Sequence, residues 1–233
     1  MQNKVIVVTG AFGTLGTAVA RAFSNQGAAV AMLGHAPQVP VQLDSLRSDR
    51  LALLPGIDIT KPDAAKAAMD AAASMFGGID VLVNIAGGFR SQTLEEGSVA
   101  IWDELYSLNL KTAVVATKAA LPHLLARSTG RVINVGSGSA AGRATAGMGA
   151  YAASKAGVQR LTESLAKELR DRGVTVNAVL PGTIDTERNR AEMPTANFAR
   201  WVTPDELADV IIFFASDAAR AVTGASLPVL GRG

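Results

Sequence analysis

Residues 5–16 read Val5-Ile6-Val7-Val8-Thr9-Gly10-Ala11-Phe12-Gly13-Thr14-Leu15-Gly16. The four consecutive apolar residues at the start predict a buried strand. A helical pattern runs from about residue 15 to residue 26 and ends at Gly27, which predicts a helix directly after that strand. The glycine-rich turn between them lets backbone N–H groups approach a pyrophosphate, because glycine carries no Cβ to block the approach. The alternative interpretation is a tight strand–helix turn that binds no ligand.

Short apolar runs and longer helical patterns continue to alternate along the chain. Further strands are predicted at residues 29–33, 51–54, 79–84, 131–135, 174–180 and 226–230, and further helices at 62–75, 98–127, 150–171 and 204–215. Repeated β-α units with apolar strands predict an α/β fold, a doubly wound parallel sheet of the Rossmann-like kind. We expect a single domain over residues 1–233. The polar segment 187–198 is the least regular, and we expect a short loop or lid there.

The composition narrows the classes of function. Lys and Arg number 22 against 20 Asp and Glu, and this near balance gives no argument for nucleic acid or an anionic membrane as a partner. The absence of cysteine excludes disulfides, zinc–thiolate sites and cysteine nucleophiles. His35 and His123 are far apart in sequence, which argues against a histidine-based metal site. No apolar stretch approaches the length of a membrane span, so we expect a cytoplasmic protein.

Tyr151 and Lys155 stand four residues apart at the start of a predicted helix. Residues at this spacing share one helix face, so an ammonium would stand beside a phenol. A nearby positive charge lowers the pKa of tyrosine from its usual value near ~10. A phenol tuned in this way can exchange a proton during catalysis. Taken alone, the same spacing also describes a surface lysine whose stem packs over a tyrosine.

Further motifs follow the glycine turn in a fixed order. They are Asn84-Ile85-Ala86-Gly87 after the fourth strand, Asn109 in the long helix, Ser137 after the fifth strand, Tyr151 with Lys155, and Pro181-Gly182 with Thr186 after the sixth strand. With these motifs the chain resembles the short-chain dehydrogenase/reductase family over essentially its full length. The resemblance implies an NAD(P)-dependent oxidoreductase that transfers a hydride between the nicotinamide and a small-molecule carbonyl or alcohol.

The resemblance also implies roles for four catalytic residues. Tyr151 would be the general acid/base, and Lys155 would hold the nicotinamide ribose and lower the pKa of the phenol. Ser137 would polarise the substrate oxygen, although Ser139 stays open as the alternative serine. Asn109 would hold a water that connects Lys155 to solvent.

A larger set of residues would bind the cofactor if the resemblance holds. The set comprises Thr9, Gly10, Phe12, Gly13, Thr14, Leu15, Gly16, His35, Asp58, Ile59, Asn84, Ala86, Gly87, Lys155, Pro181, Gly182, Ile184 and Thr186. The three turn glycines would cradle the phosphates, and residues 84–87 would line the adenosine side and brace the sheet. Asp58 would accept from the adenine amino group, or be an ordinary turn carboxylate. The Ile184 backbone and Thr186 would meet the nicotinamide carboxamide.

Two features depart from the commoner pattern of single-domain members. The spacing Gly10-x-x-Gly13-x-x-Gly16 is closer to that of extended members, many of which are epimerases and dehydratases. A cofactor-retaining isomerase or lyase is therefore an alternative, although only 47 residues follow Thr186. A non-catalytic dinucleotide-binding sensor is a third hypothesis. In addition, no acidic residue follows the second strand at Leu33-Gly34-His35, which favours NADP over NAD.

The sequence indicates the substrate pocket and the oligomeric assembly less directly than the cofactor site. Segments 89–98, 138–148 and 187–200 would shape the substrate pocket, and Trp201 would close it or pack at a subunit contact. Members of the resembled family commonly pair their two long helices, here 98–127 and 150–171. We therefore expect a homo-oligomer, a dimer or a tetramer, with no nucleic-acid or membrane partner and no metal site.

Overall fold

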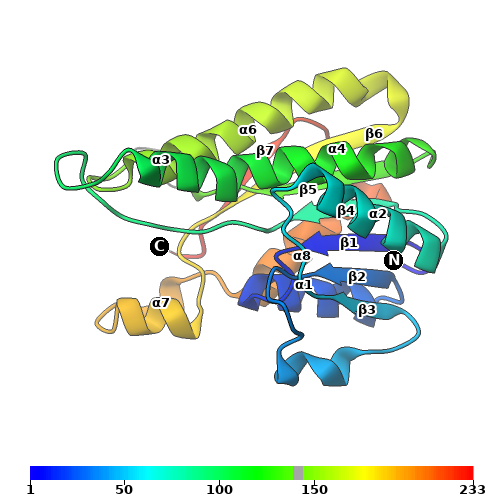
Figure 1. The fold of residues 1–233 in the computed structure, drawn as a ribbon, viewed down its shortest axis with the longest axis horizontal. Coiled ribbons are helices and arrows are strands. Elements are labelled where there is room, and N and C mark those ends of the chain that lie inside the picture. The colour runs from blue at the N-terminus through cyan, green and yellow to red at the C-terminus, as the bar shows by residue number, and fades with distance from the viewer. Residues whose placement is uncertain (139–143, 233) are drawn as a thin grey trace.

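A seven-stranded parallel sheet forms the centre of the molecule in the computed structural model, which describes residues 1–138 and 144–232 (Figure 1). Its strands are β1 (Val5–Thr9), β2 (Ala29–Leu33), β3 (Leu51–Leu54), β4 (Val81–Asn84), β5 (Gly130–Val135), β6 (Val174–Pro181) and β7 (Ser226–Val229). They lie in the order β3-β2-β1-β4-β5-β6-β7, and every neighbouring pair is parallel. The predicted doubly wound parallel sheet is therefore confirmed.

Helices cover both faces of this sheet. The α-helices of the described residues are α1 (Thr14–Asn25), α2 (Pro62–Phe76), α3 (Ala100–Leu105), α4 (Thr112–Leu125), α6 (Gly149–Leu169), α7 (Glu187–Glu192) and α8 (Pro204–Ala215). The 3-10 helices are η1 (Val41–Leu46), η3 (Arg170–Arg172), η4 (Phe198–Arg200) and η5 (Asp217–Ala219), and η2 (Tyr106–Lys111) is a π-helix. Buried side chains of α1 and α8 pack on one face of the sheet, and those of α2, α4 and α6 pack on the other.

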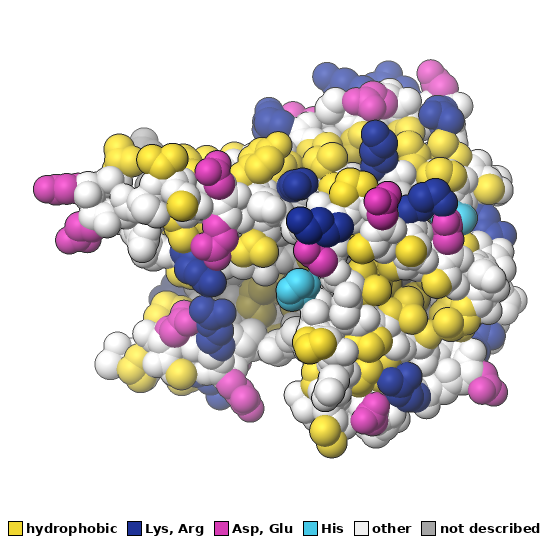
Figure 2. All heavy atoms as spheres, viewed as in Figure 1, with side chains coloured by type: hydrophobic (Ala, Val, Ile, Leu, Met, Phe, Trp, Pro, Cys, Tyr) yellow, Lys and Arg dark blue, Asp and Glu magenta, His cyan; other side chains and the backbone are white. Residues whose placement is uncertain are grey.

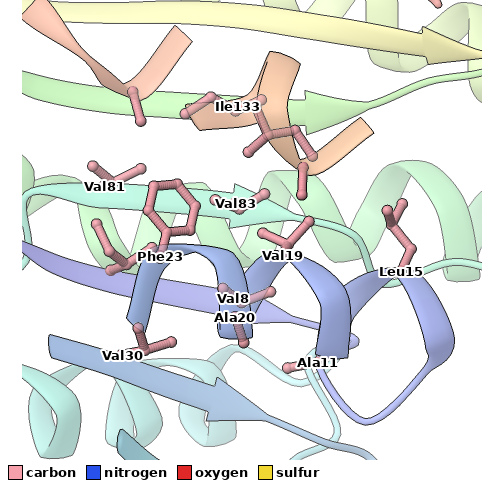
Figure 3. Close-up of a cluster of buried hydrophobic side chains, with 14 of the residues drawn as sticks. Val8, Ala11, Leu15, Val19, Ala20, Phe23, Val30, Val81, Val83 and Ile133 are labelled. Carbon is pink, nitrogen blue, oxygen red and sulfur yellow. The ribbon is translucent and has the colours of Figure 1, made fainter. Parts of the chain in front are cut away.

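The side-chain alternation within each strand divides the core into two layers. Ile6 and Val8 of β1 point to the face covered by α1, while Val7 points to the opposite face. In Figure 3, Val19 and Phe23 of α1 lie over the strands of their own layer. Because both faces of each central strand are buried, the strands are continuous apolar runs in the sequence.

Two segments differ from the sequence prediction. The predicted helix at 98–127 is interrupted by η2, a π-helical stretch between α3 and α4. The predicted loop at 187–198 begins with a six-residue helix, α7. Thr186 caps that helix, because its hydroxyl oxygen accepts the N–H of Asn189 at 3.1 Å. This cap therefore stabilises a short helix in a segment whose irregular, polar sequence predicted a loop.

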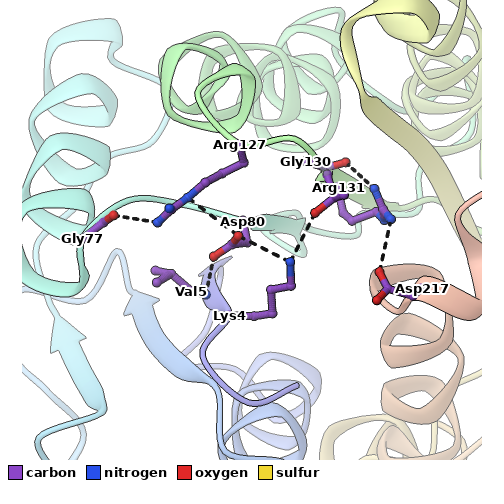
Figure 4. A network of polar contacts seen from close by, with 9 residues as sticks. Lys4, Val5, Gly77, Asp80, Arg127, Gly130, Arg131 and Asp217 are labelled. Atoms are coloured by element: carbon purple, nitrogen blue, oxygen red, sulfur yellow. Dashed lines mark hydrogen bonds and ion pairs between the residues drawn. The ribbon is translucent and has the colours of Figure 1, made fainter.

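A charged network ties the strands together at the edge opposite the strands' carboxyl ends (Figure 4). The Asp80 side chain is buried and accepts the N–H of Val5 at 2.9 Å. Lys4 and Arg127 each approach Asp80 with a nitrogen–oxygen distance of 3.7 Å. Two cations and a backbone donor therefore surround one buried carboxylate, which links the start of β1 to the start of β4.

Two kinds of feature are missing from residues 1–138 and 144–232. No helix in these ranges is long and apolar enough to cross a membrane. No group of three or more His, Cys, Asp or Glu side chains in the same ranges is arranged to hold a metal ion.

We expect the replacement Asp80→Ala to lower the free energy of unfolding by about 3–5 kcal/mol, because it leaves a buried backbone N–H and two half-buried cations without their partner. Urea unfolding followed by circular dichroism measures this change. As the matched control, Asp209→Ala on the exposed side of α8 should stay within about 0.5 kcal/mol of the parent. Equal stabilities of the two variants would contradict this role of Asp80.

Candidate active site

The carboxyl ends of the central strands form the edge at which the predicted site residues gather. The strand order reverses between β1 and β4, and the turns after β1, β4, β5 and β6 all emerge at this edge. Figure 2 shows a hollow at this end of the molecule, between the part that carries α3 and the part that carries α7. A crevice at such a topological switch point is where open α/β sheets bind their ligands.

The glycine turn after β1 fits a pyrophosphate. Gly10 has a φ of 63°, and a Cβ at this position would lie 2.8 Å from the Cα of Ala86. A Cβ on Gly16 would lie 2.5 Å from the Cα of Ala11, so both glycines are required by close packing. A Cβ on Gly13 would have no contact shorter than 3.5 Å, which leaves the surface of the turn open. No side chain caps α1, so the N–H groups of its first turn are available to an anion.

Thr9 and Asn84 lie beneath this turn and brace it. The Thr9 hydroxyl oxygen accepts the N–H groups of Ile85 and Ala86, both at 3.2 Å. The Asn84 amide donates to Thr117 at 3.1 Å and to Asn134 at 2.9 Å. Thr9 and Asn84 are both buried, so these side chains position the backbone of the site from below.

Ser137 and Tyr151 come together across the crevice. Ser137 lies two residues after the end of β5, is buried, and forms a side-chain hydrogen bond with the phenol of Tyr151. Tyr151 lies in the first turn of α6 and is half-buried. The alternative serine, Ser139, lies outside the described residues. The geometry thus brings together the serine and the tyrosine that the sequence pattern paired.

Lys155 lies one turn further along α6 and is 5% exposed. Its ammonium donates to the carbonyl oxygen of Val135 at 2.9 Å. Burial disfavours the charged form and lowers the pKa of Lys155 from 10.5 to about 8. Lys155 is therefore a buried amine, and the carbonyl oxygen at the end of β5 stabilises its charged form.

The expectation that Lys155 lowers the pKa of Tyr151 is wrong for this structure. Burial raises the pKa of Tyr151 above its usual value, and the hydrogen bond with Ser137 offsets only part of that increase. Lys155 directs its ammonium to the Val135 carbonyl, so the phenol gains no stabilisation from a directed contact with the charge. The phenol therefore holds its proton at neutral pH.

Asn109 lies in η2 and is buried. Its side-chain oxygen accepts the N–H of Gly88 at 2.9 Å, and its amide donates to the Gly88 carbonyl and to Ser154, both at 3.0 Å. A Cβ on Gly87 would lie 2.6 Å from the Asn109 side-chain oxygen and 3.3 Å from the Lys155 ammonium. Asn109 and Lys155 thus meet at Gly87, and the π-helical turn lies where such turns often mark a functional site.

Phe89 packs against the candidate catalytic tyrosine. The two ring centroids are 4.9 Å apart with an interplanar angle of 81°, an edge-to-face contact. The loop is held on the other side by an ion pair between Arg90 and Glu104 at 3.3 Å. The sequence placed Phe89 and Arg90 in a pocket-shaping segment, but nothing in the local pattern signals a ring contact between residues 89 and 151.

Asp58, Ile59 and His35 lie at the far side of the glycine turn. A side-chain oxygen of Asp58 accepts the N–H of Thr60 at 3.0 Å and its hydroxyl at 2.6 Å, and this hydroxyl lowers the pKa of Asp58. Asp58 thus has a structural role at a turn, and its second oxygen is not used in these bonds. Ile59 is buried and packs in the core, whereas His35 is exposed near Asp58.

The turn after β6 is fixed from both sides. Gly182 donates its N–H to Val229 at 3.0 Å, and the Ile184 carbonyl accepts from the Asn189 amide at 2.8 Å. Pro181 ends β6 within the sheet.

A hollow of about 330 Å³ lies beside this turn, lined by Gly182, Thr183, Asn197, Arg200, Trp201 and Leu230. Trp201 lines this hollow, and its two expected roles, closing the substrate pocket or packing at a subunit contact, stay predictions.

Comparisons with known proteins agree with this geometry. The sequence profile of the family described as "short chain dehydrogenase" matches residues 4–197. The chain is 36% identical to 3-oxoacyl-[acyl-carrier-protein] reductase of Vibrio cholerae, over 99% of this chain and 97% of that protein. It is 38% identical to cis-4-hydroxycyclohexanecarboxylate dehydrogenase of Sinomonas cyclohexanicum, over 98% of this chain and 96% of that protein.

A solved structure shares the fold over the whole length. It is a double mutant of a short-chain dehydrogenase/reductase of Serratia marcescens, which is 29% identical and superposes with a TM-score of 0.88. The match covers 99% of this chain and 98% of that chain.

We expect Lys155→Met to raise the free energy of unfolding at pH 7 by roughly 1–3 kcal/mol, because it removes a buried charge. The parent should gain stability as the pH rises from about 8 towards 10.5, since in that window the unfolded chain binds more protons than the folded one. The variant should lose this slope. Urea unfolding between pH 7 and 10 measures both effects.

Lys118→Met, at an exposed lysine of α4, is the matched control and should keep the parental slope. A Lys155→Met variant that unfolds with the parental pH dependence would show that Lys155 is not the source of the slope.

Proposed function

This chain belongs to the short-chain dehydrogenase family and is an NAD(P)-dependent oxidoreductase, and we propose that it works through Ser137, Tyr151 and Lys155. The hydrogen bond between Ser137 and Tyr151 at the sheet edge carries this proposal. The substrate is a small molecule with a carbonyl or alcohol group, and its reacting oxygen lies at the Ser137 and Tyr151 hydroxyls.

Tyr151 handles the proton in this proposal. The nicotinamide cofactor supplies or accepts the hydride when it is bound. Because burial raises the pKa of Tyr151, the phenol is protonated at neutral pH and can donate its proton to the oxygen of a carbonyl substrate. The Ser137 hydroxyl stabilises the negative charge that develops on the same oxygen. In the direction of alcohol oxidation, the phenol must first release its proton to solvent, and the phenolate then accepts the proton of the alcohol.

Lys155 and Asn109 serve Tyr151 and the cofactor. The Lys155 ammonium, which lies beside Gly87, would hold the nicotinamide ribose. Asn109 adjoins Lys155 at Gly87 and holds a water that returns the proton from solvent. The buried position of both side chains supports this relay, because a hydrogen bond is stronger where bulk water is excluded.

When bound, the cofactor would be held by the glycine turn, with the N-terminus of α1 facing its pyrophosphate and residues 35 and 58 on its adenosine side. We favour NADP, because no acidic side chain follows β2 at Gly34 or His35 to repel a 2′-phosphate. The named relatives are a reductase and a dehydrogenase, so they support net hydride transfer. Nothing in them supports a cofactor-retaining isomerase or a non-catalytic sensor.

We propose further that the chain forms a homo-oligomer through its long helices. Trp102, Tyr106 and Val114 are spaced by four or eight residues and are 40%, 55% and 39% exposed. They lie on α3, η2 and α4, which form one helical stretch beside α6. A row of large apolar side chains of this kind is typical of a subunit contact.

Tyr151→Phe tests the proposed chemistry. The variant lacks the proton donor, so we expect kcat for NADPH- or NADH-dependent reduction of a carbonyl panel to fall by about 10²–10⁴-fold. Absorbance of the reduced cofactor, followed over time, measures the rate. Tyr106→Phe removes the hydroxyl of the other tyrosine and should leave the rate unchanged. Equal turnover by the parent and Tyr151→Phe would refute the role of Tyr151.

Multi-angle light scattering tests the assembly. We expect a dimer or tetramer for the parent, and a smaller species for Trp102→Glu combined with Tyr106→Glu, because buried unpaired carboxylates oppose association. Val41→Glu, at an 84% exposed position on η1, should keep the parental mass. A monomeric parent would rule out this arrangement.

A further inference from the structure

Tyr151 lies at a point of its helix that leaves the orientation of its ring open. It is the third residue of α6, so no complete helical turn precedes it to restrict its side-chain rotamer. Its nearest neighbours, Gly149, Ala150 and Ala152, have no side-chain atom beyond Cβ that could pack against the ring. Contacts from outside the helix therefore fix the plane of the phenol.

The ring of Phe89 supplies such a contact. Its centroid lies 4.9 Å from that of the Tyr151 ring, and the two ring planes meet at 81°. In this edge-to-face geometry the positive edge of one ring meets the negative face of the other, so the attraction depends on the angle between the two planes. Together with the hydrogen bond between Ser137 and the phenol, this contact holds Tyr151 from two sides.

The loop that carries Phe89 is fastened immediately before it. Gly88 donates its N–H to the side-chain oxygen of Asn109 at 2.9 Å, and its carbonyl oxygen accepts the Asn109 amide at 3.0 Å. Both backbone polar groups of Gly88 are thus bound to one buried side chain. Since Asn109 also adjoins Lys155 at Gly87, the loop is joined to the other residues of the site.

The loop is fastened again directly after Phe89. The Arg90 side chain folds back to donate to the Phe89 carbonyl oxygen at 2.8 Å, and it pairs with Glu104 of α3 at 3.3 Å. The N–H of Gln92 donates to the carbonyl oxygen of Gly147 at 2.8 Å, and Gly147 lies just before α6 begins. The loop is therefore bound to the start of the same helix that carries the partner ring, so the two rings are held together.

We propose that Phe89 is a positioning residue for the reaction: its ring fixes the plane of the Tyr151 ring and so keeps the phenol hydroxyl at Ser137 and at the reacting oxygen of the substrate. A displacement of about 1 Å in a reacting geometry can slow a reaction by about 10²-fold, so a ring that fixes the proton donor contributes to the rate. Phe89 acts through Tyr151 and not through contact with the substrate. The inference rests on the proposed function, because it assumes that Tyr151 is the proton donor.

Replacement of Phe89 by leucine tests this role, because leucine keeps the apolar bulk and lacks the ring. The energy of an edge-to-face pair corresponds to about a 3- to 10-fold change in rate, so we expect kcat for reduction of the best carbonyl substrate of the panel to fall by this factor. KM should stay within about 2-fold of the parent, since the interaction acts on the transition state. Absorbance of the reduced cofactor measures both constants.

Two further variants accompany Phe89→Leu. Phe89→Tyr restores a ring at this position and should recover most of the parental kcat. Phe213→Leu is the matched control, because Phe213 is 44% exposed against 37% for Phe89 and also contacts a neighbouring ring, Phe214, at 5.6 Å. It should keep the parental kcat and KM. Phe89→Met takes the place of Phe89→Leu if circular dichroism shows that the leucine variant does not fold.

A double-mutant cycle with Tyr151→Phe gives the decisive result. In the Tyr151→Phe background no hydroxyl is left to position, so the addition of Phe89→Leu should change the residual kcat by less than about 2-fold. The residual rate is measured with the enzyme concentration raised to match the loss in kcat. A positioning role therefore predicts that the effect of Phe89→Leu depends on the Tyr151 hydroxyl.

Three results would overturn the inference while leaving the proposed function intact. The first is a Phe89→Leu variant with the parental kcat, and a raised KM in that variant would make Phe89 a wall of the substrate pocket. The second is a loss of the same size in both backgrounds of the cycle. The third is a Phe89→Tyr variant as slow as Phe89→Leu. If Tyr151→Phe itself turns over at the parental rate, the proposed role of Tyr151 is refuted, and the inference with it.

Discussion

The site depends on the close approach of two turns, the one after β1 and the one after β4. The Thr9 hydroxyl accepts two backbone N–H groups from the second turn, and the missing Cβ of Gly10 lets the two backbones touch at Ala86. Because the strand order reverses between these strands, their turns diverge above this contact and open a crevice. The glycine turn, the Gly87 surface and the helix with Tyr151 all border that crevice.

Burial gives the two titratable groups of the site their properties. The fold places Lys155 beneath the crevice, where desolvation lowers its pKa to about 8, and it places Tyr151 where desolvation raises its pKa. Holding a lysine charge in the interior costs stability, and the Val135 carbonyl offsets only part of that cost. Such an arrangement is typical of a site in which chemistry, and not stability, requires the residue.

Much of the fold and of the candidate site could be predicted from local patterns. Apolar runs marked the strands because both sheet faces are covered, and glycines after residues 26 and 76 marked helix ends. The segment 187–192 was mispredicted, because its helix depends on the Thr186 cap and not on an apolar face. The π-helical turn around Asn109 was also missed, since its sequence has the same periodicity as the helices on either side.

By itself, the sequence determined the parallel sheet, the glycine turn and the identity of the residues that meet at the crevice, because each of these follows from the order of short motifs along the chain. Only the tertiary structure decided what those residues do to one another. It turned the Lys155 ammonium towards Val135, placed Phe89 against Tyr151 and set the Phe12 ring over Gly34. The physical reason is that burial and ring contacts join segments far apart in sequence, and neither the depth of a side chain nor the space beside it is written in a local pattern.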